Sequence, residues 1–192
     1  MLAPVRTAAP AAFITAAEAK AQCRIDSTDE DTLIDALVAA ATSHLDGYSG
    51  VLGRALVTQT WRQDFDSFCD KLRLPVGDLI AITGVTYYDA SNAQQTLATS
   101  VYTAFSDALG PYAALKPDQS WPSSYARPDS VSVTWTAGYG AAASVPPAIK
   151  QAALLLVAHW YDNRSGVAVG ETPAELPMAV NSLLAPFRRV GT

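Results

Sequence analysis

The chain has 192 residues, of which 49% are hydrophobic and 16% are charged, and its formal net charge is -5. This composition is apolar enough for a folded core and excludes a chain that is disordered throughout. The negative charge disfavours nonspecific nucleic-acid binding by a basic surface, and no segment approaches the roughly 18 apolar residues of a membrane-spanning helix.

Residues 1–13 are rich in Ala and Pro and are expected to form an extended arm. A signal peptide is not predicted, because Pro4 and Pro10 interrupt the apolar run that such a peptide needs. Cys23 and Cys69 make neither a disulfide framework nor a metal-ligand cluster, and we interpret them as core residues. We therefore expect a soluble protein made in a reducing cytoplasm.

Two helices are predicted in residues 14–50, which follow the arm. Thr15 and Glu18 have the spacing of a capping box, in which two side chains of the first helical turn each cap the other's backbone. Ser27 and Glu30 repeat this spacing before a second helix, expected from about Asp29 to Tyr48. Apolar residues at three- and four-residue steps give the second helix one buried face: Leu33, Ile34, Leu37, Val38, Ala41, Leu45 and Tyr48.

Residues 55–140 are predicted to form short antiparallel strands. This segment is rich in Val, Thr, Ile and aromatic residues and is punctuated by Gly, Pro and Asn. Val131, Val133 and Trp135 alternate with Ser and Thr, as in a strand with one buried face. The segment 89–95 resembles a hairpin loop.

Helix is predicted again in residues 146–192. Pro147 suits a first helical turn, and Gly166 is a plausible stop for a helix that we expect to be buried on every side. A last short helix is expected to start near Pro177 and to precede a basic tail. The sequence thus predicts an α+β fold: one domain, residues 14–192, with a helical bundle from the N- and C-terminal segments and a central antiparallel β insertion.

The polar stretch "AHWYDNRSG" is the first candidate for chemistry, because it holds His159, Asp162, Asn163 and Arg164 close together. A zinc site needs three or four convergent ligands, and a helical protease site needs two histidines around a glutamate. Neither pattern is present in the stretch. We interpret it as the closing turn of a helix, with Arg164 placed favourably at the helix C-terminus.

Other chemical motifs are weaker. Asp64, Asp66 and Asp70 lack the glycine and terminal glutamate of a calcium loop. No Gly-x-Ser-x-Gly elbow is present, and "GYGAAAS" has neither the lysine of a phosphate-binding loop nor dinucleotide-binding spacing. We therefore expect no enzymatic activity, no metal and no cofactor.

Eight blocks follow one another between about Ile14 and Arg189: "ITAAEAKAQCRID", "DEDTLIDALVAAATSHLDGYSG", "GRALVTQTWRQDFDSF", "LRLPVGDLIAITGVTYYD", "SWPSS", "VSVTWTAGYG", "VPPAIKQAALLLVAHWYDNR" and "LPMAVNSLLAPFRR". Taken together and in this order, they resemble the head-tail connector, or adaptor, family of long-tailed double-stranded-DNA phages and phage-like gene transfer agents. The arm before Ile14 lies outside the resemblance.

The resemblance implies a structural virion protein that forms a ring, expected to be a dodecamer, between the portal and a stopper or tail-terminator protein. DNA would pass through this ring without specific binding, and assembly would begin in the host cytoplasm. In the family the C-terminal helix and tail contact the portal. The corresponding residues of this chain are Leu183, Leu184, Phe187, Arg188 and Arg189.

Two questions stay open at the level of sequence. The acidic first turn of the helix from Asp29 to Tyr48 is compatible with a channel lining and equally with a solvated face. An alternative function is a carbohydrate-binding or hydrolytic module of a phage-like particle, with Trp121, Tyr125 and Trp135 as a sugar platform beside the acids of residues 64–70.

Overall fold

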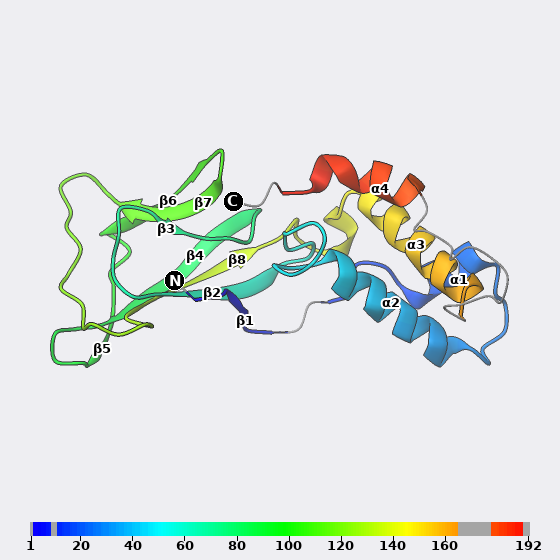
Figure 1. Cartoon of the computed structure of the whole chain (residues 1–192), viewed down its shortest axis with the longest axis horizontal. Coiled ribbons are helices and arrows are strands. Elements are labelled where there is room, and N and C mark those ends of the chain that lie inside the picture. Colours follow the sequence, from blue (N-terminus) through cyan, green and yellow to red (C-terminus); the bar gives the residue numbers. More distant parts are fainter. Residues whose placement is uncertain (1, 9–10, 165–177, 190–192) are drawn as a thin grey trace, which may run out of the picture. The chain divides into compact units, whose positions relative to one another are not determined.

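The computed structural model describes residues 2–8, 11–164 and 178–189. The chain divides into two compact units, each of which is assembled from segments distant in sequence (Figure 1). The β unit contains the described parts of Met1–Pro10 together with Thr58–Tyr139. The helical unit contains the described parts of Ala11–Val57 and Gly140–Gly191.

The helical unit is built around its longest helix. In chain order the elements are α1 (Ala16–Cys23), α2 (Asp31–Leu45), the 3-10 helix η1 (Ala142–Ser144), α3 (Pro147–Asp162), α4 (Met178–Leu184) and the 3-10 helix η2 (Ala185–Phe187). Helix α3 contacts α1, α2 and α4, so it joins the N- and C-terminal segments. The core side chains come from all four helices and include Ile34, Leu45, Ile149, Leu156 and Leu184.

The two predicted capping boxes have different outcomes. Thr15 Oγ1 accepts a hydrogen bond from the Glu18 N–H at 3.2 Å, and the Glu18 carboxylate accepts one from the Thr15 N–H at 2.7 Å, so the first box is confirmed. The second prediction is wrong. Ser27 Oγ accepts from the Asp29 N–H at 3.1 Å instead, because serine satisfies a nearby backbone group in a local turn. Helix α2 therefore begins only at Asp31.

Helix α3 confirms the predicted first-turn proline but not burial on every side. Pro147 is its first residue, where a missing N–H costs no helical hydrogen bond. Its buried residues lie on one side: Ile149, Ala152, Ala153, Leu156 and Val157. Leu154 and Leu155 are only half-buried and Gln151 is exposed. Part of the continuous apolar run therefore remains accessible to solvent.

The β unit contains two antiparallel sheets. The five-stranded sheet has the order β1-β2-β8-β4-β5, and the three-stranded sheet has the order β3-β7-β6. The strands are β1 (Val5–Arg6), β2 (Gln59–Phe65), β3 (Leu72–Arg73), β4 (Leu79–Tyr88), β5 (Gln94–Thr96), β6 (Tyr102–Asp107), β7 (Gly110–Leu115) and β8 (Val131–Ala137). Asp89 closes the predicted β4–β5 hairpin by accepting from the N–H groups of Ser91 and Ala93.

Strands β2 and β8 carry the buried face of the larger sheet. Trp61 lies opposite Trp135, and Phe65 lies opposite Val131. These side chains are at most 4% exposed, whereas Ser132, Thr134 and Thr136 on β8 are half-exposed. The predicted alternation of β8 is therefore confirmed, and its cause is burial of one face of the pleated strand.

The predicted α+β class holds broadly, but a helical bundle with one central β insertion is wrong. The described residues form four α-helices and eight strands in two separate antiparallel sheets. One of those strands, β1, comes from the N-terminal arm and pairs with β2. The arm also donates from the Thr7 N–H to the Thr60 carbonyl at 3.0 Å. A strand of two residues is too short to show a period in the sequence. Its pairing depends instead on the edge of β2, which no sequence pattern within the arm reveals.

Candidate functional site

The predicted portal-contacting residues lie at the end of the helical unit, on α4, η2 and the residues after them. Leu184 is only 1% exposed and belongs to the core. Leu183 and Phe187 are half-buried, and Arg188 is exposed. The Arg189 N–H donates to the Leu52 carbonyl at 3.1 Å, which attaches the tail to the loop after α2. The structure thus separates one buried residue from four that reach the surface.

The surface of α4 and η2 combines apolar and basic groups. Met178 is 86% exposed at the start of α4. Arg188 donates from Nη2 to Asn181 Oδ1 at 2.9 Å, so its guanidinium lies over the exposed side of the helix. Val180 and Leu184 fix the opposite side in the core. This arrangement suits contact with a protein and contains no group that suggests catalysis.

The loop that receives the tail is organised by a buried carboxylate. Asp46 is 2% exposed, and its Oδ1 accepts from the Leu56 N–H at 2.7 Å. Gly47 adopts a φ of 87° and forms a β-bridge with Arg54, a conformation that glycine adopts at little cost. Sequence patterns did not identify Asp46, because nothing local distinguishes a buried aspartate from an exposed one.

The polar stretch at the end of α3 is tied to the start of α2. The Tyr161 hydroxyl donates to the Glu30 carboxylate, and Arg164 Nη1 lies 2.7 Å from Glu30 Oε1. The Arg164 guanidinium also stacks over the Tyr161 ring at 4.4 Å. Hydrogen bonds from Arg164 and then from Tyr161 lower the pKa of Glu30, and the same carboxylate raises the pKa of Tyr161. Glu30, Tyr161 and Arg164 therefore link the start of α2 to the end of α3, and we call this cluster the interhelix clasp.

Asn163 and Trp160 of this stretch also make local contacts. Asn163 Nδ2 donates to the His159 carbonyl at 2.8 Å, which caps the end of α3. The Trp160 ring meets the His44 ring edge to face, with ring centres 6.0 Å apart. Across the described ranges 2–8, 11–164 and 178–189, no three His, Cys, Asp or Glu residues are grouped to hold a metal ion.

Glu30 and Asp31, two acids at the start of α2, have partners within the helical unit. Glu30 binds Tyr161 and Arg164, and Asp31 accepts from Lys20 Nζ at 2.6 Å. The exposed residues of α2 are small or short: Thr32, Asp35, Ala36, Ala39, Ala40 and Ser43. The solvent side of the helix is therefore nearly neutral, and the predicted acidic character is confined to its start.

The acids of residues 64–70 do not converge. Asp64 is 6% exposed and accepts hydrogen bonds from Ser132 Oγ and from Arg62 Nη2 on neighbouring positions of the sheet. Asp66 and Asp70 are exposed. Asp64 therefore has a structural role in the β2–β8 pairing.

The proposed sugar platform does not assemble either. Trp135 is fully buried, whereas Tyr125 is 44% exposed and Trp121 stacks on Phe68 with ring centres 4.7 Å apart. A platform needs aromatic faces that are open to solvent together. Trp135 cannot contribute one while the β unit is folded.

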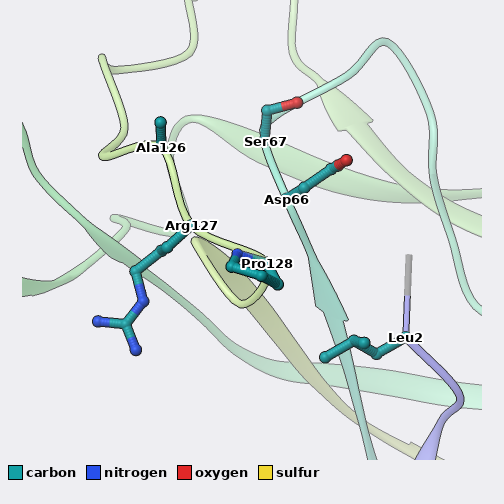
Figure 2. A pocket seen from close by; sticks show the side chains of 6 residues that line it. All are labelled: Leu2, Asp66, Ser67, Ala126, Arg127 and Pro128. Atoms are coloured by element: carbon teal, nitrogen blue, oxygen red, sulfur yellow. The ribbon is translucent and has the colours of Figure 1, made fainter.

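An open cavity of about 410 Å³ lies on the β unit, lined by Leu2, Asp66, Ser67, Ala126, Arg127 and Pro128 (Figure 2). The Arg127 side chain points away from Asp66 in this view. Its guanidinium binds both carboxylate oxygens of Asp129, at 2.7 and 2.9 Å, and stacks over the Tyr88 ring at 3.9 Å. The lining therefore offers one exposed carboxylate and no nucleophile–base pair.

Comparison with known proteins finds one family model and several solved structures that are similar to this chain. The family model of head completion proteins matches residues 12–190, and no curated protein sequence matches significantly. A chain from the neck of an empty gene transfer agent particle, computed with C6 symmetry, is 19% identical with a TM-score of 0.75. A chain from the virion of a native gene transfer agent particle is 20% identical with the same score. A chain from the neck of a native gene transfer agent particle, computed with C12 symmetry, is 21% identical with a TM-score of 0.67.

Each of these three likenesses covers 100% of this chain and 97% of the other. At such identities they show a shared fold across both units. The family match spans nearly the whole chain and confirms the resemblance to head-tail connectors that the eight sequence blocks indicate. The chain belongs to the head completion protein family.

Proposed function

We propose that this chain is a non-enzymatic structural protein of the neck of a phage or gene transfer agent particle, where it forms the adaptor ring between the portal and the tail side. The observation that carries the proposal is the head completion family match over residues 12–190. The fold likeness to chains of gene transfer agent necks, over the full length of this chain, supports it.

A ring of twelve copies is the expected assembly. The related chains come from necks computed with C6 and C12 symmetry, and both symmetries are compatible with twelve copies. A ring repeats one heterologous interface, so each copy needs two complementary faces. The half-buried Leu154 and Leu155 of α3 and the nearly neutral side of α2 can be covered by a neighbour at a low desolvation cost.

The portal contact is assigned to the surface of α4, η2 and the tail. Leu183 and Phe187 offer apolar contact area, and Arg188 and Arg189 offer positive charge, whereas Leu184 holds the segment in the core. Positive charge on an otherwise acidic chain favours an acidic or carbonyl-rich partner surface.

The experiment that tests the adaptor role mixes the purified chain with its portal and measures the masses of the complexes by mass photometry. We expect a portal complex that carries multiple copies of this chain. Folded chain and folded portal that remain separate at micromolar concentration would contradict the proposal.

A second experiment removes the chain from particles. Electron microscopy of particles made without it should show DNA-filled heads that lack tails, because the link between portal and tail side is missing. Normal tailed particles in the absence of the chain would exclude an adaptor function.

A further inference from the structure

The loop between α2 and β2, residues 46–56, presents apolar side chains to solvent. We call it the tail-binding loop, because its Leu52 carbonyl accepts from the Arg189 N–H at 3.1 Å. Tyr48 is 49% exposed and Val51 is 38% exposed. Among the described residues of the helical unit, Met178 is the only other large hydrophobic side chain that is exposed. Loops held by a rigid scaffold often carry binding residues.

The tail-binding loop is fixed in one conformation by contacts within the helical unit. The buried Asp46 carboxylate accepts from the Leu56 N–H at 2.7 Å, and the Val51 N–H donates to the His44 carbonyl at 2.9 Å. A Cβ atom at Gly50 would lie 2.6 Å from the Asp46 carbonyl oxygen, which is closer than side chains approach, so only glycine fits there. The loop therefore holds its exposed side chains ready for a partner, which lowers the entropy lost on binding.

The tail and the tail-binding loop form one continuous surface. Besides the hydrogen bond from Arg189 to Leu52, a Cβ atom at Gly53 would be in van der Waals contact with the Arg189 Cβ atom, at 3.6 Å. Arg188, the residue before Arg189, is exposed, and Phe187 is half-buried. A partner that covers the tail is therefore also within reach of the loop.

This surface carries an excess of positive charge. Residues 46–56 and 185–189 contain the three arginines Arg54, Arg188 and Arg189 and a single acid, Asp46, which is buried. The chain as a whole has a formal net charge of -5. Tyr and Arg are enriched at protein interfaces, and a basic surface favours an acidic partner surface. The complementary partner therefore combines apolar contact area with acidic groups.

We propose that the tail-binding loop belongs to the portal contact, with Tyr48 and Val51 seated against an apolar portal surface that acidic groups border. The proposal rests on the adaptor function proposed above and on its assignment of the tail to the portal. It adds a second segment of the chain to that contact. Tyr48 supplies a rigid aromatic ring, and the arginines of the loop and tail face the acidic groups.

The first test identifies what lies against Tyr48. The photo-reactive residue p-benzoylphenylalanine replaces Tyr48 in the full chain, and a mixture with purified portal is irradiated. We expect a cross-link to the portal as the main product. The same replacement at Tyr125, which is 44% exposed on the β unit, is the matched control and should leave the chain mainly without a cross-link to the portal. A main cross-link from position 48 to a second copy of the chain, or equal portal yields from the two positions, would overturn the proposal.

The second test measures affinity for the portal in two tyrosine variants. Tyr48→Ser should weaken portal binding by about tenfold or more, because it removes an aromatic anchor from the interface. Tyr125→Ser changes a tyrosine of similar exposure on the β unit and should bind as the natural chain does. Circular dichroism verifies that both variants are folded. Equal affinities of the two folded variants would overturn the proposal.

The third test examines the charge of the partner surface. Val51→Glu and Val51→Lys introduce long side chains of opposite charge at one position. Because the proposed portal surface is acidic, Val51→Glu should bind about tenfold more weakly than Val51→Lys, and added salt should reduce this difference. Equal affinities, or tighter binding by Val51→Glu, would overturn the proposal.

The last test uses the unmodified chain and does not depend on how well a variant folds. Hydroxyl-radical labelling of tyrosine side chains is compared between the free chain and the chain bound to the portal. Labelling of Tyr48 should fall severalfold on binding, whereas Tyr125 is the internal control and should not change. Unchanged labelling of Tyr48 in the bound chain would overturn the loop contact alone. Folded chain that does not bind the portal at all would overturn the adaptor function and the loop contact together.

Discussion

At the scale of residues, Glu30 explains why the end of α3 is polar. Its carboxylate accepts a hydrogen bond from the Tyr161 hydroxyl, 131 residues further along the chain, and pairs with the guanidinium of Arg164. The stretch that first suggests chemistry is thereby used to join two helices. The sequence shows the donors but not their acceptor, because Glu30 lies in a different part of the chain.

The clasp predicts how stability depends on pH. The pKa of Glu30 is held below its ordinary value of 4.5, so the stabilisation it gives is fully present above that pH and is lost as pH falls through the lower, folded value. Glu30→Gln should have a lower Tm than the natural chain at pH 7, and this difference should shrink toward pH 3. Thermal unfolding followed by circular dichroism across this range measures it. Asp29→Asn, at an exposed neighbouring position, is the control, and a pH-independent difference would contradict the clasp.

Trp160 and His159 are adjacent but should respond differently to substitution. Trp160 is half-buried against His44, so Trp160→Ala should destabilise the chain by about 2 kcal/mol, less than a fully buried aromatic. His159→Gln removes no packed ring of comparable size and should change stability by at most about 0.5 kcal/mol. Urea unfolding compares the two. Loss of function in a folded His159→Gln chain that still forms the proposed ring would show that this stretch does more than hold helices together.

At the scale of elements, two neighbouring leucines of α4 have different predicted roles. Leu184 should contribute to the stability of the fold and Leu183 to portal binding. Leu184 is 1% exposed, and Leu184→Ala should cost about 2–5 kcal/mol by leaving a cavity. Leu183 is half-buried, and Leu183→Ala should cost less than about 1 kcal/mol while weakening the proposed portal complex. Unfolding curves and portal titrations on both variants separate these effects. A Leu183→Ala chain that binds the portal normally would move the contact elsewhere on this segment.

An element could be predicted from the sequence where the interactions that form it involve residues close together in the chain. The Thr15–Glu18 box and the alternation of β8 were correctly predicted, because a cap and a half-buried pleat leave their pattern in adjacent residues. The Ser27–Glu30 box has the same spacing, yet Glu30 is drawn to Arg164 and Tyr161 by tertiary contacts. The β1 pairing was missed because it depends on an edge 55 residues away in sequence, between Arg6 and Trp61.

At the scale of the whole molecule, the charge predicts behaviour toward DNA. A formal net charge of -5 disfavours nonspecific binding to the negatively charged DNA backbone. The chain, alone or in the proposed ring, should therefore not retard duplex DNA in gel electrophoresis at about 0.15 M salt. A complex of micromolar or tighter affinity that weakens steeply with added salt would contradict passive passage of DNA through the proposed ring.

By itself, the sequence determined the α+β class, the position of most helices and the family, because these depend on local periodicity and on the order of recognisable sequence blocks along one chain. Only the tertiary structure decided that the strands form two sheets, and that Leu184 is in the core while Leu183 reaches the surface. These outcomes depend on which distant segments meet. Burial and strand pairing are properties of such encounters, and no single stretch of residues encodes them alone.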